Sequence, residues 1–244
     1  MYSLSKKNAI KIKPMSLSEL QIKEENIEEL LRTNIDKNCE DQESMLIVGR
    51  QVRIESNARS DLTAIDKDGN IVLIEIKRDK KDIQNREKAF EFQAIWYAAS
   101  YATIETLDDL FKNVYSSYIE KYRNEFELGS LTSYEFGMRK LKDFLEINAE
   151  GKSFNHKQRI ILVASDFDEQ TLSAVAWLNN NNVDISCYKL TLYRINDEIY
   201  FDVYKILPVD DYSSYYVNLI NKGSIVKSAK TVLRREFYQK MIVC

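Results

Sequence analysis

Residues 59 to 77 read Arg-Ser-Asp-Leu-Thr-Ala-Ile-Asp-Lys-Asp-Gly-Asn-Ile-Val-Leu-Ile-Glu-Ile-Lys, and this stretch predicts a β-hairpin. Residues 61–65 alternate between polar and apolar side chains, and residues 66–70 contain the Asp-Gly pair that favours a tight turn. Ile71 to Ile74 form an uninterrupted, largely branched apolar run, which is typical of a central strand buried on both faces.

The end of this hairpin carries three side chains of chemical interest. Side chains alternate along a strand, so Glu75 and Lys77 should share one face, and Asp61 on the antiparallel partner can lie opposite them. Two carboxylates beside an ammonium are suited to metal-assisted cleavage of a phosphodiester. A Glu-x-Lys at a strand exit is also a common cross-strand ion pair without chemistry, so the motif needs support from its surroundings.

Composition describes a globular protein of 244 residues that is 44% hydrophobic and 30% charged. We expect a cytoplasmic location because no stretch has the length and apolarity of a membrane span or of a signal peptide. Three widely spaced cysteines and one histidine, His156, support neither a disulfide framework nor a zinc site. The net charge of −3 excludes a uniformly basic nucleic-acid coat, but residues 77–88 hold six basic residues against three acidic ones.

The periodicity of the chain predicts an α/β fold with a mixed central β-sheet flanked by helices. Residues 1–22 read as an N-terminal arm, 23–207 as the main domain with a helical insertion at about 105–150, and 208–244 as a C-terminal extension that includes an amphipathic segment from Ser228. The expected helices cover 24–34, 85–102, 107–122, 134–145 and about 168–178, and the expected strands cover 45–55, 61–65, 71–77, 159–165, 183–188, 190–194 and 198–206. The many tyrosines of the insertion favour core or interface positions over base stacking.

These features together resemble the PD-(D/E)xK nuclease superfamily and its restriction-endonuclease-like core. Asp61 matches the first carboxylate, with Ser60 in place of the usual proline, and Glu75-Ile76-Lys77 match the second half of the motif. Within the superfamily, residues 23–101 resemble the nuclease domain of the NucS/EndoMS-like mismatch endonucleases. A second similarity is to the RecB-like branch, in which Gln-x-x-x-Tyr, here Gln93 and Tyr97, follows the Glu-x-Lys strand.

The resemblance implies a role for each residue at the end of the hairpin. Asp61, Glu75 and the backbone carbonyl of Ile76 would bind Mg²⁺ or Mn²⁺, while Lys77 would orient or deprotonate a water or stabilise developing charge. Glu28 on the preceding helix would complete the metal site, with Glu24 and Glu25 as competitors one turn away. Gln93 would position water or phosphate, unless it is incidental and Tyr97 is a core residue. The residues expected to contact nucleic acid are Arg59, Arg78, Lys80, Lys81, Arg86 and Tyr97.

The sequence thus predicts a metal-dependent endonuclease that hydrolyses phosphodiester bonds, with DNA favoured over RNA as the substrate. Two other functions remain open at this point. One is a non-catalytic nucleic-acid-binding module that keeps the fold, and the other is a nuclease subunit of a prokaryotic defence or restriction system that a partner activates. A homodimer is also compatible with the sequence.

Overall fold

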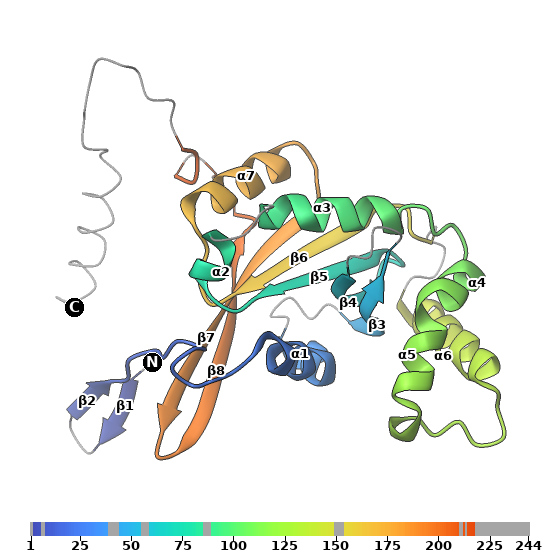
Figure 1. The fold of residues 1–244 in the computed structure, drawn as a ribbon, viewed down its shortest axis with the longest axis horizontal. Helices are drawn as coiled ribbons and strands as arrows, with labels where there is room; N and C mark the ends of the chain where they lie inside the picture. The colour runs from blue at the N-terminus through green and yellow to red at the C-terminus, as the bar shows by residue number, and fades with distance from the viewer. Residues whose placement is uncertain are drawn as a thin grey trace.

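A six-stranded mixed β-sheet with helices on both faces forms the centre of the computed structural model (Figure 1). The structure describes residues 2–5, 8–38, 44–54, 59–84, 89–148, 154–209, 212 and 214–217. The expected α/β class with a mixed sheet is confirmed. Arg86 and the amphipathic segment from Ser228 lie outside the described residues.

The strands of the sheet follow one another in chain order, from β3 at one edge to β8 at the other. The first three strands pair antiparallel, β5 to β7 pair parallel, and β8 returns antiparallel to β7. The bounds are Met45–Arg53 for β3, Arg59–Asp66 for β4, Ile71–Lys77 for β5, Gln158–Ala164 for β6, Ile185–Ile195 for β7 and Glu198–Leu207 for β8. The antiparallel β3–β5 part of the sheet carries the predicted hairpin.

The turn between β4 and β5 explains why this hairpin forms locally. One carboxylate oxygen of Asp66 accepts hydrogen bonds from the amides of Asp68 and Asn70, both at 2.9 Å. Gly69 adopts a φ of 81°, a conformation that glycine tolerates without steric cost. Ile71 to Ile76 are then all buried, which confirms β5 as an interior strand.

Helices cover the sheet from opposite sides, as Figure 1 shows. Helix α1 (Glu24–Asn38) packs on β3, β4 and β5, whereas α3 (Phe90–Tyr101) packs on β5 and β6 and beside α7 (Glu169–Asn180). A short helix, α2 (Lys80–Gln84), follows β5 directly. The apolar stripe predicted for α3 is confirmed, because Phe90, Ala94, Tyr97, Ala98 and Tyr101 are all buried.

A helical unit, defined here as residues 107–148, lies beside the β3 edge of the sheet (Figure 1). It consists of α4 (Leu107–Leu110), the π-helical turn η1 (Phe111–Tyr115), α5 (Ser116–Lys121), the 3₁₀ turn η2 (Arg123–Glu125) and α6 (Ser133–Asn148). The sequence predicted one regular helix over 107–122. Apolar spacing fails to show the π turn because one wider turn leaves the same side chains on the buried face.

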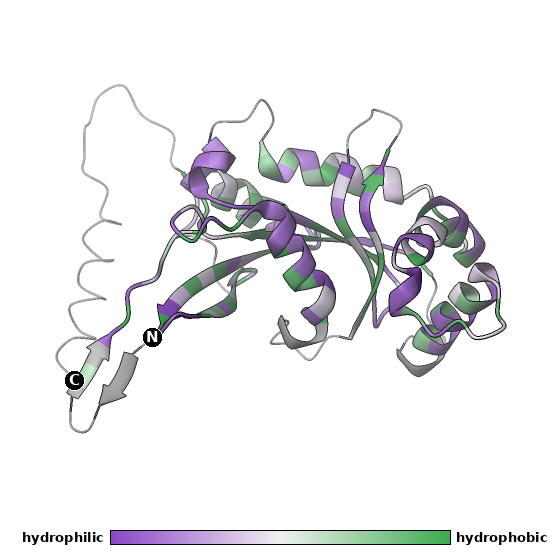
Figure 2. Cartoon of the chain, turned by 60° about the horizontal axis from the view of Figure 1, so that its bottom comes forward, coloured by the Kyte–Doolittle hydropathy of each residue, from purple (hydrophilic) through white to green (hydrophobic). Residues whose placement is uncertain are grey.

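The aromatic residues of the helical unit are mainly core residues, as the sequence favoured. Tyr115 and Tyr118 are buried, and Phe111 packs edge-on against Tyr115. In Figure 2 the helices carry both hydrophobic and hydrophilic segments, which is the pattern of elements with one buried face. No helix among the described residues is long and apolar enough to cross a membrane.

One expectation about the rest of the chain needs correction, and the N-terminal arm contains structure of its own. The segments 183–188 and 190–194 form one long strand, β7, because β8 pairs with it along most of its length and Asn196 and Asp197 supply the positive φ angles of the turn. The arm at 1–22 is partly structured, since β1 (Tyr2–Ser5) and β2 (Asn8–Lys11) form a hairpin and the Met15 amide donates to the Leu192 carbonyl.

Candidate active site

Asp61 and Glu75 meet on neighbouring strands at the centre of the candidate site. Leu62 pairs with Ile74, which places Asp61 and Glu75 at the next opposed positions of β4 and β5. The Asp61 amide donates to Glu75 Oε1 at 3.3 Å, and the Ile76 amide donates to Asp61 Oδ2 at 2.8 Å. The predicted juxtaposition of the two carboxylates is therefore present.

Burial makes this pair electrostatically unusual. Glu75 is 0% exposed, and its second oxygen, Oε2, has no hydrogen-bond partner among the residues that the structure describes. Burial raises the pKa of Glu75 well above its ordinary value, and the charge of Asp61 raises it further. Burial likewise raises the pKa of Asp61 to about 7, although Lys77 and the Ile76 amide act to lower it. Two acids in this position require a proton or a cation to be stable.

Lys77 is the cation that the structure places beside them. Its Nζ donates to the Ile76 carbonyl at 3.0 Å and to Glu24 Oε1 at 3.1 Å. Burial acts to lower the pKa of Lys77, but the negative charges of Asp61 and Glu24 outweigh it and the pKa is raised. Lys77 is therefore an ammonium at neutral pH, and Glu24, rather than Glu28, is the α1 residue that contacts it.

Glu28 is buried at 3% exposure but faces a different set of partners. It accepts hydrogen bonds from Arg50 Nε at 3.0 Å and from Gln51 Nε2 at 2.8 Å. The same Gln51 nitrogen lies 3.4 Å from Asp61 Oδ1. Glu28 is thus joined to Asp61 through an amide. Arg50 and Gln51 were missed from the sequence, where they read only as alternating residues of a strand.

Gln93 and Tyr97 of α3 form a polar pair, and the tyrosine interacts electrostatically with the carboxylates. Gln93 Nε2 donates to the Tyr97 hydroxyl at 2.9 Å. Burial raises the pKa of Tyr97, and the negative charges of Glu75 and Asp61 add to the effect. One turn further along, the Tyr101 hydroxyl lies 2.8 Å from both Ser60 and Thr63, which ties α3 to β4 beside Asp61. Tyr101 was expected only as a core residue.

We compared the chain with family models, curated proteins and solved structures. None of the three comparisons gives a match. The chemistry of the site is therefore the guide to function.

The groups of the site that could bind a metal ion are oxygen atoms. Among the residues that the structure describes, no three Asp, Glu, His or Cys side chains form a group that could hold a metal ion. The site instead offers the carboxylates of Asp61 and Glu75 and the carbonyl of Ile76. All three are hard ligands of the kind that Mg²⁺ and Mn²⁺ prefer, and Mg²⁺ commonly binds through one or two carboxylates with water completing its shell.

The basic residues expected to contact nucleic acid are spread around this strand end. Arg78 lies next to Asp79 and Asp82, at 3.5 Å and 3.4 Å, and is about one-third exposed. Lys80 and Lys81 are in α2, shortly after β5, and Arg59 is exposed at the start of β4. Outside this region, Cys187 is buried and His156 is exposed, so neither joins the candidate site.

Proposed function

We propose that this protein is a metal-dependent nuclease of the PD-(D/E)xK type, acting on DNA. One observation carries the proposal: the buried Glu75 lies beside the half-buried Asp61 and Lys77, and one Glu75 carboxylate oxygen has no hydrogen-bond partner among the described residues. A single lysine already shared with Glu24 leaves the pair short of positive charge. A divalent cation would supply that charge.

The residues present fit such a cation. Asp61 and Glu75 would hold it together with the carbonyl of Ile76, and the unpartnered Glu75 oxygen offers a ready ligand. When bound, Mg²⁺ or Mn²⁺ acidifies a water and neutralises charge on a phosphate. Glu28 is engaged by Arg50 and Gln51, so we assign it a supporting role.

Lys77 can supply a positive charge beside the substrate phosphate. Its raised pKa keeps the ammonium protonated, and of the roles considered from the sequence this favours orienting water or stabilising negative charge on the phosphate over accepting a proton. Glu24 and the Ile76 carbonyl hold the ammonium beside the carboxylates. The position of Lys77 at the exit of β5 is therefore set by both its neighbours in sequence and α1.

The remaining residues bind and orient the substrate. Gln93, held by Tyr97, would donate its amide to a phosphate oxygen or a water near the carboxylates. Arg59, Arg78, Lys80 and Lys81 would contact the phosphate backbone, which gives affinity without sequence information. Binding should therefore weaken steeply with salt.

A screen of nucleic-acid structures tests the proposal. Purified protein and its Asp61→Ala variant are incubated with Mn²⁺ and with double-stranded, single-stranded, branched and mismatched DNA, and with RNA. We expect the wild type to cut at least one DNA substrate and the variant to cut none. DNA binding without cleavage of any substrate, together with no Mn²⁺ binding, would identify a non-catalytic module instead.

A further inference from the structure

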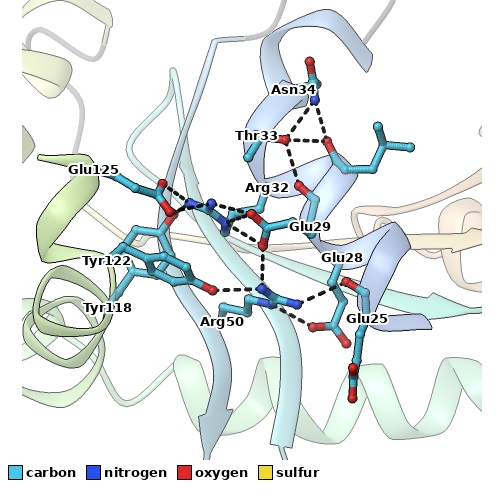
Figure 3. Close-up of polar contacts among 11 residues, drawn as sticks. Glu25, Glu28, Glu29, Arg32, Thr33, Asn34, Arg50, Tyr118, Tyr122 and Glu125 are labelled. Atoms are coloured by element: carbon cyan, nitrogen blue, oxygen red, sulfur yellow. Dashed lines mark hydrogen bonds and ion pairs between the residues drawn. The ribbon is translucent and has the colours of Figure 1, made fainter. Parts of the chain in front are cut away.

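A polar network joins the helical unit to β3 and α1 (Figure 3). Arg50 on β3 stands at its centre and donates to the Tyr122 hydroxyl at 2.9 Å, to the Glu25 carbonyl at 3.1 Å and to the carboxylates of Glu28 and Glu29. Arg32 on α1 adds a second link, because it pairs with Glu29 and with Glu125 of the helical unit. Each element of the network is therefore held by charge-assisted hydrogen bonds.

The network reaches Asp61 through one residue, Gln51. Its amide nitrogen donates to Glu28 Oε1 at 2.8 Å and lies 3.4 Å from Asp61 Oδ1. Two carboxylates that would otherwise repel each other share this donor. The other Asp61 oxygen, Oδ2, accepts from the Ile76 amide, so the carboxylate is held at both ends.

The backbone of Gln51 adds an independent observation. Gln51 has a φ of 54°, inside strand β3, in the left-handed region that glycine and asparagine tolerate best. Such conformations persist where the surrounding structure holds them, and they cluster at functional sites. Here the strained backbone presents a side chain that bridges Glu28 and Asp61.

We propose that Gln51 is a positioning residue that fixes the carboxylate of Asp61, and that Arg50 and Glu28 hold Gln51 so that the helical unit is coupled to the site. The orientation of Asp61 is a property of the metal-free protein. Only its consequence for metal binding rests on the proposed nuclease function.

The Ile76 amide gives a direct readout, because its hydrogen-bond acceptor is Asp61 Oδ2. We compare the Ile76 amide proton shift by NMR in wild type, Gln51→Gly and Gln51→Asn, without metal or DNA and at mildly alkaline pH. Glycine removes the side chain and tolerates the positive φ, so the substitution introduces no new backbone strain. In Gln51→Gly we expect the Ile76 amide proton to shift upfield while the Ile74 amide proton stays unmoved. In Gln51→Asn the Ile76 shift should return part of the way to its wild-type value. The thermal stability of Gln51→Gly should be unchanged or higher.

An unmoved Ile76 amide in Gln51→Gly would overturn the proposal. Calorimetry with Mn²⁺ then gives the second readout, for which we expect about a tenfold loss of affinity in Gln51→Gly, as is typical when a residue behind a metal ligand is removed. If Ile76 moves but the wild type binds no Mn²⁺, positioning by Gln51 stands and the nuclease proposal fails. The two failures are therefore distinguishable.

Coupling to the helical unit has its own test. Tyr122→Phe removes the hydroxyl that Arg50 contacts but keeps the ring under Arg32, whose guanidinium lies 4.0 Å from the ring centroid. Tyr134→Phe is the matched control, because its hydroxyl contacts Asp108 within the helical unit. We expect Tyr122→Phe to shift the Ile76 amide in the same direction as Gln51→Gly, by less, and Tyr134→Phe to leave it unmoved. Equal behaviour of the two tyrosine variants would contradict the coupling.

Discussion

The Asp61 amide donates to the Glu75 carboxylate at 3.3 Å, so a half-buried acid and a fully buried one occupy opposed positions of neighbouring strands. Burying one carboxylate without full compensation is costly, and a second acid beside it increases the cost. A purely structural pair of strands would be more stable with apolar residues at these positions. The proposed divalent-cation site would account for this arrangement, and its cost in the metal-free protein should be measurable.

The metal-free protein should lose stability as pH rises from about 4 to about 7. The folded-state pKa of Asp61 is raised to about 7, whereas the ordinary value is 3.8, so in this window the folded protein binds more protons than the unfolded chain. The stabilising contribution is therefore complete below the lower value and lost above the higher one. Thermal unfolding in a chelator should show Asp61→Asn gaining stability over wild type with increasing pH. A constant difference between the two proteins would contradict the raised pKa.

Lys77→Met should separate metal binding from cleavage. The substitution removes a positive charge and frees the Ile76 carbonyl, so Mn²⁺ affinity measured by calorimetry should be retained or increased. Cleavage of DNA in single-turnover assays should fall by about 100-fold or more, as expected when a preorganised charge on the transition state is lost. Lys142→Met, at an exposed position of α6, is the control and should cleave at the wild-type rate. A Lys77→Met protein that cleaves normally would remove Lys77 from the mechanism.

Gly49→Ala should loosen the contact between β3 and the helical unit. A Cβ atom at this position would lie 2.7 Å from a methyl carbon of Val114 in η1 and 2.7 Å from one of Val52. Overpacking of this kind costs about 1–3 kcal/mol in free energy of unfolding. Denaturant titration should show the loss, with exposed Lys142→Ala within about 0.5 kcal/mol of wild type. A Gly49→Ala protein with wild-type stability would mean that η1 packs less tightly on β3 than the 2.7 Å distance to Val114 indicates.

Two arginines with the same i,i+3 spacing to a glutamate should differ in their contribution to stability. The Arg32 side chain is 5% exposed, pairs with Glu29 and Glu125, and donates to the Tyr118 hydroxyl. Arg32→Leu should lower the free energy of unfolding by about 1.5–3 kcal/mol, the range for hydrogen bonds to charged groups. Arg123 is 54% exposed and pairs with Glu120. Replacing Arg123 with leucine should lower the free energy of unfolding by at most about 1 kcal/mol. Equal losses would show that burial of Arg32 adds nothing.

Local patterns predicted the elements that carry the candidate site. The apolar run of β5, the Asp-Gly turn and the stripe of α3 each follow from contacts within a few residues, and they sufficed to place Asp61 opposite Glu75. Residues 183–194 were predicted as two strands rather than one, because the pairing of β7 with β8 along most of its length is a tertiary property. Periodicity therefore predicted the elements but not every boundary.

The supporting residues could not be predicted in the same way. Glu24 and Glu28 are one helical turn apart, and only the packing of α1 on the sheet decides which one reaches Lys77 and which one reaches Arg50. Gln51 gave no signal, because neither its positive φ nor its contact with Asp61 follows from residue type. Long-range contacts of this kind depend on how α1, β3 and the helical unit assemble.

Glu75→Gln tests the central claim most directly, because the substitution keeps the size of the side chain and removes its negative charge. The measurement is the single-turnover rate of DNA cleavage in Mg²⁺ for wild type and variant, on the substrate that the wild type cuts. We predict metal-dependent cleavage by the wild type and a loss of about 100-fold or more in the variant. Cleavage by Glu75→Gln at the wild-type rate would show that this carboxylate pair is not the active site.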